Sequence, residues 1–507
     1  MTHWLVAPVL LPALLAPIML LFLRRRLMES RVLSIGGCLA LLALAVVLVA
    51  QADTGVTQTY AMGDWQAPFG IVLVLDRLSA LMLLTTAILA LAVMIYAVVT
   101  GLDRRGWHFH PLFQFQMLGL NGAFLTGDLF NLFVFFEVML IASYGLMLHG
   151  GGGARLKAGV QYVVINLVGS TLFLVAVGLL YGTTGTLNMA HMGERIGQAP
   201  VGDHGLILAG GLLMVAVFAL KAAIAPLHFW LPRTYASTSA PMAALFAIMT
   251  KVGAYCILRF TTVTFGEGAG DMAWAPAPYL LPAALATMLV GFIGVMGARN
   301  LRHLAAFSVV GSMGTLVSAI SVFTPQSTAA ALYYLPHSTF AAAALFLVAD
   351  QIARRRGEYG DVLSPSPVFV QAGVLSGLFF LTAIAVVGLP PLSGFPGKLL
   401  ILDAVRDAPG GWWIWGFILG TTVIGLLAFA RAGSTLFWKS AATPGEIKAA
   451  PAVAPIASAL VVAGLLSILA LLTLAGGPVS AYLNATGEQI YEAGAYGGAV
   501  LAPGEGG

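Results

Sequence analysis

The sequence predicts an all-α polytopic membrane protein with about fourteen transmembrane helices, and three observations support this fold class. Of the 507 residues, 59% are hydrophobic and only 9% are charged, whereas a water-soluble domain is about 25% charged. Apolar runs of about 20 residues, each long enough to cross the hydrocarbon layer as a helix, recur along the chain. The weak alternation that a transmembrane β-barrel requires is not visible.

The apolar runs predict one integral membrane domain over residues 1–507. The expected spans, in chain order, are 4–23, 31–50, 71–100, 109–126, 128–149, 156–181, 205–229, 239–262, 275–298, 303–322, 327–351, 370–408 (interrupted), 412–438 and 452–475. The first run is interpreted as a span rather than a signal peptide, because Arg24, Arg25 and Arg26 follow it instead of preceding it. The segment from Gly476 onward is glycine-rich and acidic, and we expect no further span there.

The positions of the cationic residues predict the topology. Seventeen of the 24 lysines and arginines fall in loops that follow odd-numbered spans. Only three, Arg195, Arg259 and Arg406, are assigned to the opposite side. Because Lys and Arg accumulate on the cytoplasmic side of membranes, we expect both termini on the outer face.

Two of the expected spans carry prolines beside a lysine at membrane depth. Span 7 contains Lys221-Ala-Ala-Ile-Ala-Pro226, and span 12 contains Gly388-Leu-Pro-Pro-Leu-Ser-Gly-Phe-Pro-Gly-Lys398. Proline interrupts a helix, and such breaks persist in a membrane where protein or water satisfies the freed backbone groups. Broken helices at matching places suggest two inverted five-helix repeats, spans 4–8 and 9–13. The expected organisation is therefore 1–108 (spans 1–3), 109–262 (first repeat), 275–440 (second repeat) and 452–475 (last span).

A row of ionisable residues lies within these spans. Glu137 is nine residues past the start of its span, which is about 13 Å of helix. Lys221 and Lys251 are near mid-span, and Lys398 follows a helix break. Buried charge in a membrane is costly, so each residue is either half of a structural ion pair or a carrier of protons. We favour proton transfer, because lysine, unlike arginine, can lose its proton when it is buried. Glu137 and Lys221 are the preferred pair.

Histidines and aspartates extend this row with alternatives left open. His337 can relay a proton between Lys251 and Lys398 or pack as a neutral side chain. His228 has the same two interpretations, and His303 is either a helix cap or part of an entry path. Asp403 is either a partner of Lys398 or an outward exit. Asp76 with Arg77 is expected to form an interfacial pair, and Asp128 is expected to cap its helix.

Several classes of site are absent from the sequence. No phosphate-binding glycine loop, Cys/His metal cluster or haem attachment motif occurs. Cys38 and Cys256 both lie in apolar runs, so neither a disulfide nor a thiolate metal site is indicated. We therefore expect no cofactor and no metal.

Several motifs resemble the D subunits of Mrp-type (Mnh/Pha) multisubunit cation/proton antiporters, and more loosely the proton-pumping subunits of respiratory complex I. They are Gly127-Asp-Leu-Phe-Asn-Leu-Phe-Val-Phe-Phe-Glu137, Tyr181-Gly-Thr-Thr-Gly-Thr-Leu-Asn188, Phe229-Trp-Leu-Pro232, Thr250-Lys251-Val-Gly-Ala-Tyr255, Asn300-Leu-Arg-His-Leu-Ala-Ala-Phe-Ser308 and Gly388-Leu-Pro-Pro-Leu-Ser-Gly-Phe-Pro-Gly-Lys398. The resemblance covers most of spans 4–13.

The resemblance implies a path for protons through Glu137, Lys221, Lys251, His337 and Lys398. Two positions depart from the family pattern. Ala341 stands where relatives often carry a lysine, so that span 11 would depend on His337 and water. Arg233 stands where an acidic residue is usual.

The resemblance also implies a secondary transporter subunit rather than an enzyme. It would lie in the cytoplasmic membrane of a bacterium, with the other Mrp-type antiporter subunits (A, B, C, E, F and G) as partners, and would export Na+, K+ or Li+ in exchange for protons. Two alternatives remain: a pumping subunit of a complex I-like oxidoreductase or membrane-bound hydrogenase, and an assembly scaffold whose buried charges are only structural.

Overall fold

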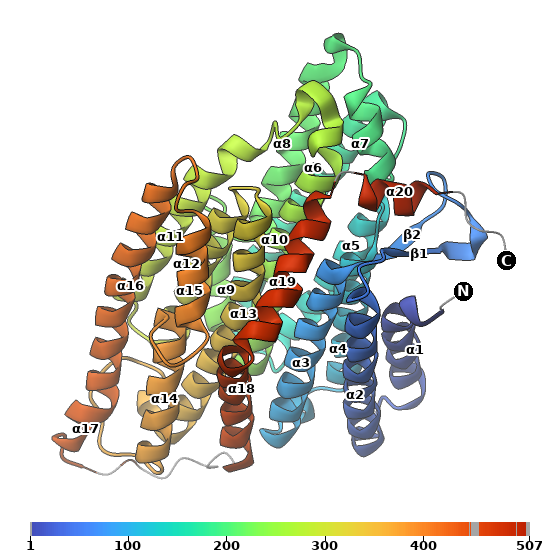
Figure 1. Cartoon of the computed structure of the whole chain (residues 1–507). Helices are drawn as coiled ribbons and strands as arrows, with labels where there is room; N and C mark the ends of the chain where they lie inside the picture. Colours follow the sequence, from blue (N-terminus) through green and yellow to red (C-terminus); the bar gives the residue numbers. More distant parts are fainter. Residues whose placement is uncertain (1–2, 446, 448–455, 493, 503–507) are drawn as a thin grey trace.

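The computed structural model describes residues 3–445, 447, 456–492 and 494–502 as a helical bundle (Figure 1). Lys448 and the first residues of the predicted span 452–475 lie outside the described residues. Within the described residues, eleven helical segments are long and apolar enough to cross a membrane. They contain α2 (Leu27–Ala52), α3 (Arg77–Val99), α5 (Leu129–Leu148), α6 (Gly153–Thr184), α8 (His204–Lys221), α10 (Ala240–Thr264), α11 (Leu280–Gly297), α12 (Leu301–Ile320), α13 (Pro325–Arg355), α16 (Gly411–Gly433) and α18 (Ile456–Leu474).

The other three predicted spans are also helical, but these helices are shorter. They are α1 (Ala7–Phe22), α4 (Phe109–Leu125) and the interrupted pair α14 (Ala372–Val387) and α15 (Gly394–Ala404). All fourteen predicted ranges therefore contain a helix, and the predicted all-α fold class is confirmed. The remaining short helices are α7 (Met189–Gly197), α9 (Trp230–Ser237), α17 (Lys439–Ala441), α19 (Gly476–Tyr491) and α20 (Ala495–Leu501).

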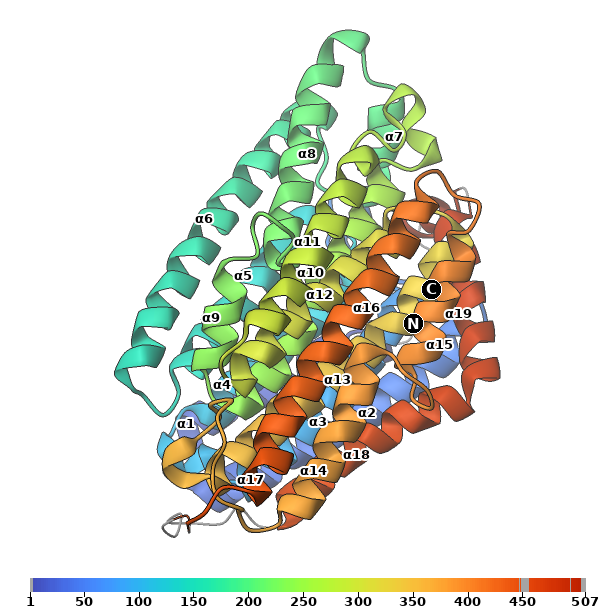
Figure 2. The same ribbon diagram turned by 90° about the vertical axis from the view of Figure 1, so that its left-hand side faces the viewer.

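Helices α10 and α13 form the centre of the bundle. The most apolar stretch of each is completely buried, whereas only about a third of the corresponding stretch is buried in α2, α16 and α18. Helix α6 lies at the edge of the bundle (Figure 2). Its 32 residues correspond to about 48 Å of helix, which exceeds the roughly 30 Å of hydrocarbon, so α6 is long enough to cross this layer at a tilt. Lys251 and His337 are thus carried by the two most enclosed helices.

Both predicted helix breaks are present. Helix α8 ends at Lys221 and α9 begins at Trp230, while α14 ends at Val387 and α15 begins at Gly394. Gly388, with φ +82°, ends α14 in the left-handed region that favours glycine. A Cβ at this position would lie 2.9 Å from Cδ of Lys398. The glycine therefore lets the chain turn where the lysine stem passes.

Two isolated backbone bridges support the predicted repeat. At the start of α5, Asp128 bridges Asn188, which follows α6. At the start of α12, Asn300 bridges Val362, which follows α13. In both places the first residue of the bridge caps its helix through its side chain, so the predicted capping role of Asp128 is confirmed. Equivalent bridges after equivalent helices favour the pairing of α5 with α12, and the exact limits of the repeats stay a prediction.

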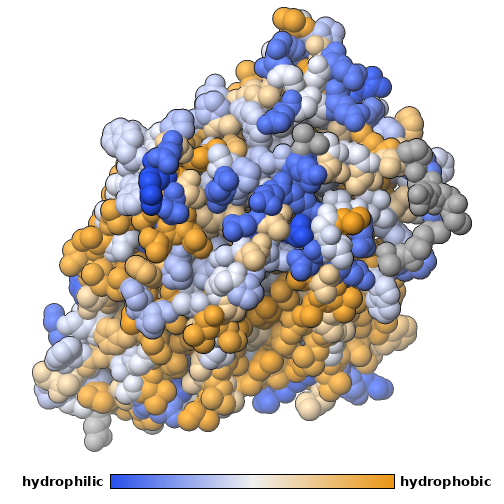
Figure 3. Space-filling view, viewed as in Figure 1, coloured by the Kyte–Doolittle hydropathy of each residue, from blue (hydrophilic) through white to orange (hydrophobic). Residues whose placement is uncertain are grey.

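Two segments differ from the sequence-based expectation. The start of the predicted span 71–100 is a strand, β2 (Val72–Leu75), paired antiparallel with β1 (Gln58–Ala61). The segment after Gly476 is helical: α19 packs against α13, and the Tyr482 hydroxyl donates to the backbone oxygen of Arg77. Hydrophobic side chains gather over the lower half of the molecule in Figure 3, and hydrophilic ones over the upper part near these segments. Helices α19 and α20 thus lie over the more polar part of the bundle.

Candidate functional site

Four of the five residues predicted to carry protons are buried. Lys251 is completely buried, His337 is 1% exposed, and Lys221 and Lys398 are each 6% exposed. Glu137 is half-buried on α5. The five side chains come from α5, α8, α10, α13 and α15, so the row crosses the bundle from helix to helix.

Glu137 and Lys221 do not form an ion pair, although both residues are described. Lys221 Nζ donates to Oδ1 of Asn166 at 2.9 Å, and the hydroxyl of Ser170 donates to Glu137 Oε1. Asn166 and Ser170 are four residues apart, on one face of α6. The carboxylate still acts electrostatically on Lys221. The predicted pair is thus open, and each charge is bound by a neutral side chain of α6.

Lys251 has no hydrogen-bond partner among the described residues, although its side chain is completely buried. Leaving a buried polar group unsatisfied costs about 1–3 kcal/mol, and more for a charged group. A lysine in such a place is stabilised when it loses its proton or when water binds it. Lys251 is therefore a poor structural anchor and a suitable site for reversible protonation.

His337 connects α13 to the second helix break. Its Nδ1 lies 2.9 Å from the hydroxyl of Ser393, which is in the break between α14 and α15. The charges of Lys251 and Lys398 both act on the imidazole. His337 is thus within the electrostatic reach of both lysines, and its role as a relay between them stays a prediction.

Lys398 reaches back across the helix break to the end of α14. Its Nζ donates to the backbone oxygen of Val387 at 2.7 Å and to the hydroxyl of Thr422 at 2.8 Å. A carbonyl at a helix C-terminus carries partial negative charge, so the end of α14 stabilises the ammonium. Like Lys221, this lysine is held by neutral acceptors.

The three candidates for relay or access, His228, His303 and Asp403, have different surroundings. Nδ1 of His228 is buried in the first break and has no hydrogen-bond partner among the described residues. His303 lies beside its own helix cap, because its backbone N–H donates to Oδ1 of Asn300 and its Nδ1 is 2.9 Å from the same oxygen.

Asp403 is exposed and pairs with Arg406 at 2.6 Å. The expectation that Asp403 is a partner of Lys398 is wrong, because the lysine extends toward Val387 instead.

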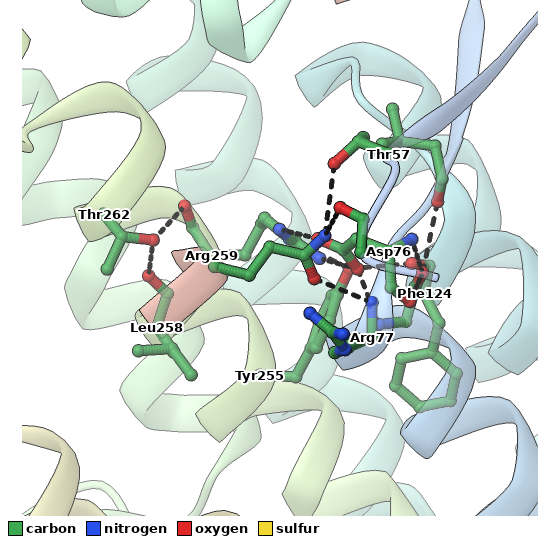
Figure 4. A network of polar contacts seen from close by, with 12 residues as sticks. Thr57, Asp76, Arg77, Phe124, Tyr255, Leu258, Arg259 and Thr262 are labelled. Atoms are coloured by element: carbon green, nitrogen blue, oxygen red, sulfur yellow. Dashed lines mark hydrogen bonds and ion pairs between the residues drawn. The ribbon is translucent and has the colours of Figure 1, made fainter. Parts of the chain in front are cut away.

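The predicted pair of Asp76 with Arg77 is also wrong. Asp76 caps α3 and is paired with Arg259 of α10 at 2.6 Å, and both side chains are buried (Figure 4). Arg77 lies beside Asp53 and donates to its backbone oxygen instead. Arg259, which lies near the end of the predicted span 239–262 and was counted on the outer side, is thus a buried partner that links α3 to α10.

Four polar residues of this site were not predicted from the sequence: Asn166, Ser170, Ser393 and Thr422. Asn166 and Ser170 carried a usable signal, since two polar residues four apart in an apolar span share one helix face. Ser393 and Thr422 carried none, because their role depends on where the second break folds. No group of three or more His, Cys, Asp or Glu side chains in the described ranges is placed to hold a metal ion.

Comparison with known proteins places this geometry in a family. The family model described as NADH:quinone oxidoreductase/Mrp antiporter, TM, matches residues 126–425. This range contains all five residues of the row, both helix breaks and both backbone bridges.

Two relatives are similar over most of their length. The D subunit of a probable K(+)/H(+) antiporter of Rhizobium meliloti (strain 1021) is 37% identical over 524 residues, which cover 96% of this chain and 95% of that protein. The D subunit of a Na(+)/H(+) antiporter of Bacillus subtilis (strain 168) is 37% identical over 458 residues, which cover 89% of each.

Solved structures share the fold. A chain of the Mrp complex from Dietzia sp. DQ12-45-1b has a TM-score of 0.86 at 27% identity, with 99% of this chain and 100% of that chain covered. A chain of respiratory complex I from Thermus thermophilus with bound NADH has a TM-score of 0.76 at 26% identity, with 98% and 100% covered.

Proposed function

Since this chain belongs to the NADH:quinone oxidoreductase/Mrp antiporter family of membrane subunits, we propose that it is the D subunit of a multisubunit monovalent cation/proton antiporter. In this role it is a transporter subunit rather than an enzyme, and it assembles with the other Mrp-type antiporter subunits (A, B, C, E, F and G). It lies in the cytoplasmic membrane of a bacterium with both termini on the outer face. The complex exports Na+ or K+ in exchange for protons, and the two relatives differ in which of these cations their names give.

The observation that carries this proposal is Lys251, a completely buried lysine with no hydrogen-bond partner among the described residues. A buried lysine whose only task is structural is expected to have a fixed acceptor or a carboxylate. Lys251 instead lies in the middle of a row of titratable side chains. Reversible loss of its proton accounts for both its burial and its lack of a partner.

The proposed proton path runs through Glu137, Lys221, Lys251, His337 and Lys398. A cavity of about 10 Å³ lies beside Lys221 and is also lined by Met249 and Val252, which flank Lys251 on α10. This volume suits about one water molecule, and such a water supports transfer between the two lysines. From Lys251 the path continues to His337, on which the charges of Lys251 and Lys398 both act.

Access to the second half of the path is proposed at Asp403. This residue lines a cavity of about 620 Å³ together with Asp407 and Tyr333, and Tyr333 lies one helical turn before His337 on α13. Two carboxylates at such a mouth attract cations and protons. This supports the interpretation of Asp403 as an outward exit. His228 in the first break and His303 at the start of α12 are proposed as relay or entry groups.

The function is tested with Glu137→Ala and Lys221→Ala in the assembled complex. We expect each variant to abolish cation/proton exchange in everted vesicles while the partner subunits still co-purify. Thr171→Val is the matched control, because Thr171 is exposed on α6 and its hydroxyl donates only to its own helix backbone. Exchange at the control rate in either assembled variant contradicts the proposal.

A second candidate is a proton-pumping subunit of a complex I-like oxidoreductase or membrane-bound hydrogenase. The similarity to a chain of Thermus thermophilus complex I favours this candidate enough to test it. Purification of the native complex separates the two functions. Co-purified subunits with flavin or iron–sulfur clusters support the pump, whereas a complex without them supports the antiporter.

A further inference from the structure

Two polar residues of α6, Asn166 and Ser170, hold the two charges of the first half of the path apart. Asn166 accepts the hydrogen bond from the Lys221 ammonium at 2.9 Å, and Ser170 donates to the Glu137 carboxylate. Four residues of helix correspond to a rise of about 6 Å. Lys221 therefore stands about one helical turn away from the place where Glu137 is held.

The amide of Asn166 is oriented to accept from the lysine. Its Nδ2 donates to the backbone oxygen of Tyr162, one turn earlier on the same helix, at 2.8 Å. This contact fixes which end of the amide faces Lys221, because only the oxygen of an amide can accept a hydrogen bond from an ammonium. Asn166 thus offers a preoriented neutral acceptor, which is an alternative to the Glu137 carboxylate.

Gly169, which lies between Asn166 and Ser170 on α6, leaves room for the Lys221 ammonium. A Cβ added at Gly169 would lie 3.7 Å from Lys221 Nζ and 2.7 Å from Cδ2 of Leu220. Any side chain here would therefore enter the space next to the lysine, between the levels of Asn166 and Ser170. The absence of a side chain at Gly169 therefore leaves space beside the ammonium and against Leu220.

We propose that Asn166 is a positioning residue that holds the Lys221 ammonium in a resting place away from Glu137, and that Gly169 keeps clear its way to the carboxylate. This inference rests on the proposed function and adds two residues to it. A neutral acceptor holds an ammonium less strongly than a carboxylate does, so Lys221 can leave Asn166 during each transport cycle. Closing and opening of the pair is then set by competition between the two acceptors.

Among the described residues, the surroundings of Lys221 contain few other groups that could compete. Within this part of the chain, Glu137 of α5 is the charged residue that acts on Lys221. The adjoining cavity is lined by Tyr162 of α6, Trp230 of α9 and Met249 of α10. The Tyr162 hydroxyl is bonded to Ser143, and the Trp230 indole donates to the backbone oxygen of Leu220. The choice for Lys221 is therefore between Asn166 and Glu137.

The test measures exchange in everted vesicles as a function of pH for Asn166→Leu and Asn166→Thr. Without the amide, Lys221 closes on Glu137. We then expect the maximal rate to fall about tenfold and the pH of half-maximal exchange to rise by about one unit, because a carboxylate favours the charged ammonium. Threonine supplies an oxygen acceptor and should keep the rate within about threefold of the unaltered complex. A merely structural role of Asn166 would not move the pH profile.

Two further variants keep the test decisive if Asn166→Leu fails to assemble. Asn166→Asp is nearly isosteric and places a carboxylate against Lys221, so it should lock the ammonium and reduce exchange about tenfold. Gly169→Ala fills the crossing space and should slow exchange. Its matched control is Gly178→Ala on the same helix, where an added Cβ meets no described atom within 4 Å.

The outcomes separate this inference from the proposed function. If Lys221→Ala abolishes exchange while Asn166→Leu and Asn166→Asp match the Thr171→Val control in rate and pH profile, the positioning role is overturned and the proton path stands. If Lys221→Ala exchanges normally, the proposed function itself fails. Loss of exchange in Asn166→Asp, with a shifted pH profile in Asn166→Leu, supports both.

Discussion

Buried charges occur in two regions of this molecule, and the two regions treat them differently. Toward the helix ends, arginines are paired directly with buried carboxylates: Arg259 with Asp76, Arg31 with Asp103, and Arg354 with Asp350, each at 2.6 Å. In the middle of the bundle, the lysines face neutral groups. Lys221 is bound to an amide, Lys398 to a carbonyl and a hydroxyl, and Lys251 has no partner among the described residues.

The difference follows from the chemistry of the two cations. Arginine stays charged and binds a carboxylate through two parallel hydrogen bonds, which suits a permanent link between helices. Lysine can give up its proton when it is buried, and a neutral partner leaves that possibility open. The arginine pairs are therefore expected to control stability, and the lysine row is expected to control transport.

The largest effect on stability is expected from breaking the pair between α3 and α10. Arg259→Met leaves Asp76 buried without its partner, which should destabilise the chain by about 3–5 kcal/mol. The loss should appear as a lower melting temperature of the purified complex. The double variant Asp76→Asn/Arg259→Met removes the orphaned charge and should recover part of the stability. If Arg259→Met were as stable as the unaltered complex, the arginine pairs would not control stability as described.

A smaller effect is expected at Asp103, in the loop between α3 and α4. Burial acts to raise the pKa of this carboxyl, but the hydrogen bonds from His110 and Arg31 outweigh burial and hold the pKa at about 2. An unfolded aspartate has a pKa of about 3.9. The carboxylate therefore contributes stability above about pH 4, and this contribution is lost as the pH falls through about 2.

Asp103→Asn should accordingly lower stability by about 2 kcal/mol at neutral pH. The deficit should shrink when melting is measured between pH 4 and the lowest pH at which the complex stays soluble. Arg26→Gln is a suitable control, because it removes an exposed pair with Glu29 at 3.7 Å, and such pairs contribute little. A deficit that is the same at every pH would show that the pair with Arg31 is not its source.

The smallest effect on stability is expected in the lysine row. Lys251→Met replaces a buried lysine that has no hydrogen-bond partner among the described residues by an apolar side chain of similar length. Stability should be unchanged or rise by about 1 kcal/mol, because an unsatisfied polar group is removed. A clear loss of stability, comparable with that of Arg259→Met, would mean that Lys251 is a structural anchor and that the two regions do not differ as described.

The transmembrane helices were easier to predict from the sequence than the segments around them and the contacts between them. Apolar runs and prolines depend on local chemistry, so all fourteen ranges and both breaks could be located. The strand at Val72 was missed because its apolar residues run directly into the helix that follows, so a strand and the start of a helix look alike there. The helix from Gly476 was missed because it packs on α13, and this contact is not visible in the local sequence. The pair of Arg259 with Asp76 was missed for a related reason, since a contact between two helices is invisible to a count of charges.

Pairings within the site were the least predictable part. Glu137, Lys221, Lys251, His337 and Lys398 stood out because an ionisable residue in an apolar span is conspicuous. Their partners did not, since Asn166 and Thr422 are ordinary residues until the helices meet. Sequence proximity also misled: Asp403 and Lys398 are one turn or so apart, yet the lysine extends across the break to Val387.

Proton transfer by Lys251, a buried lysine with no hydrogen-bond partner among the described residues, is tested most directly by exchange in the Lys251→Met complex. The complex should assemble and melt at or above the temperature of the unaltered complex, while cation-driven proton movement in everted vesicles falls to the level of vesicles without the antiporter. Exchange at the unaltered rate by this stable variant would contradict the claim.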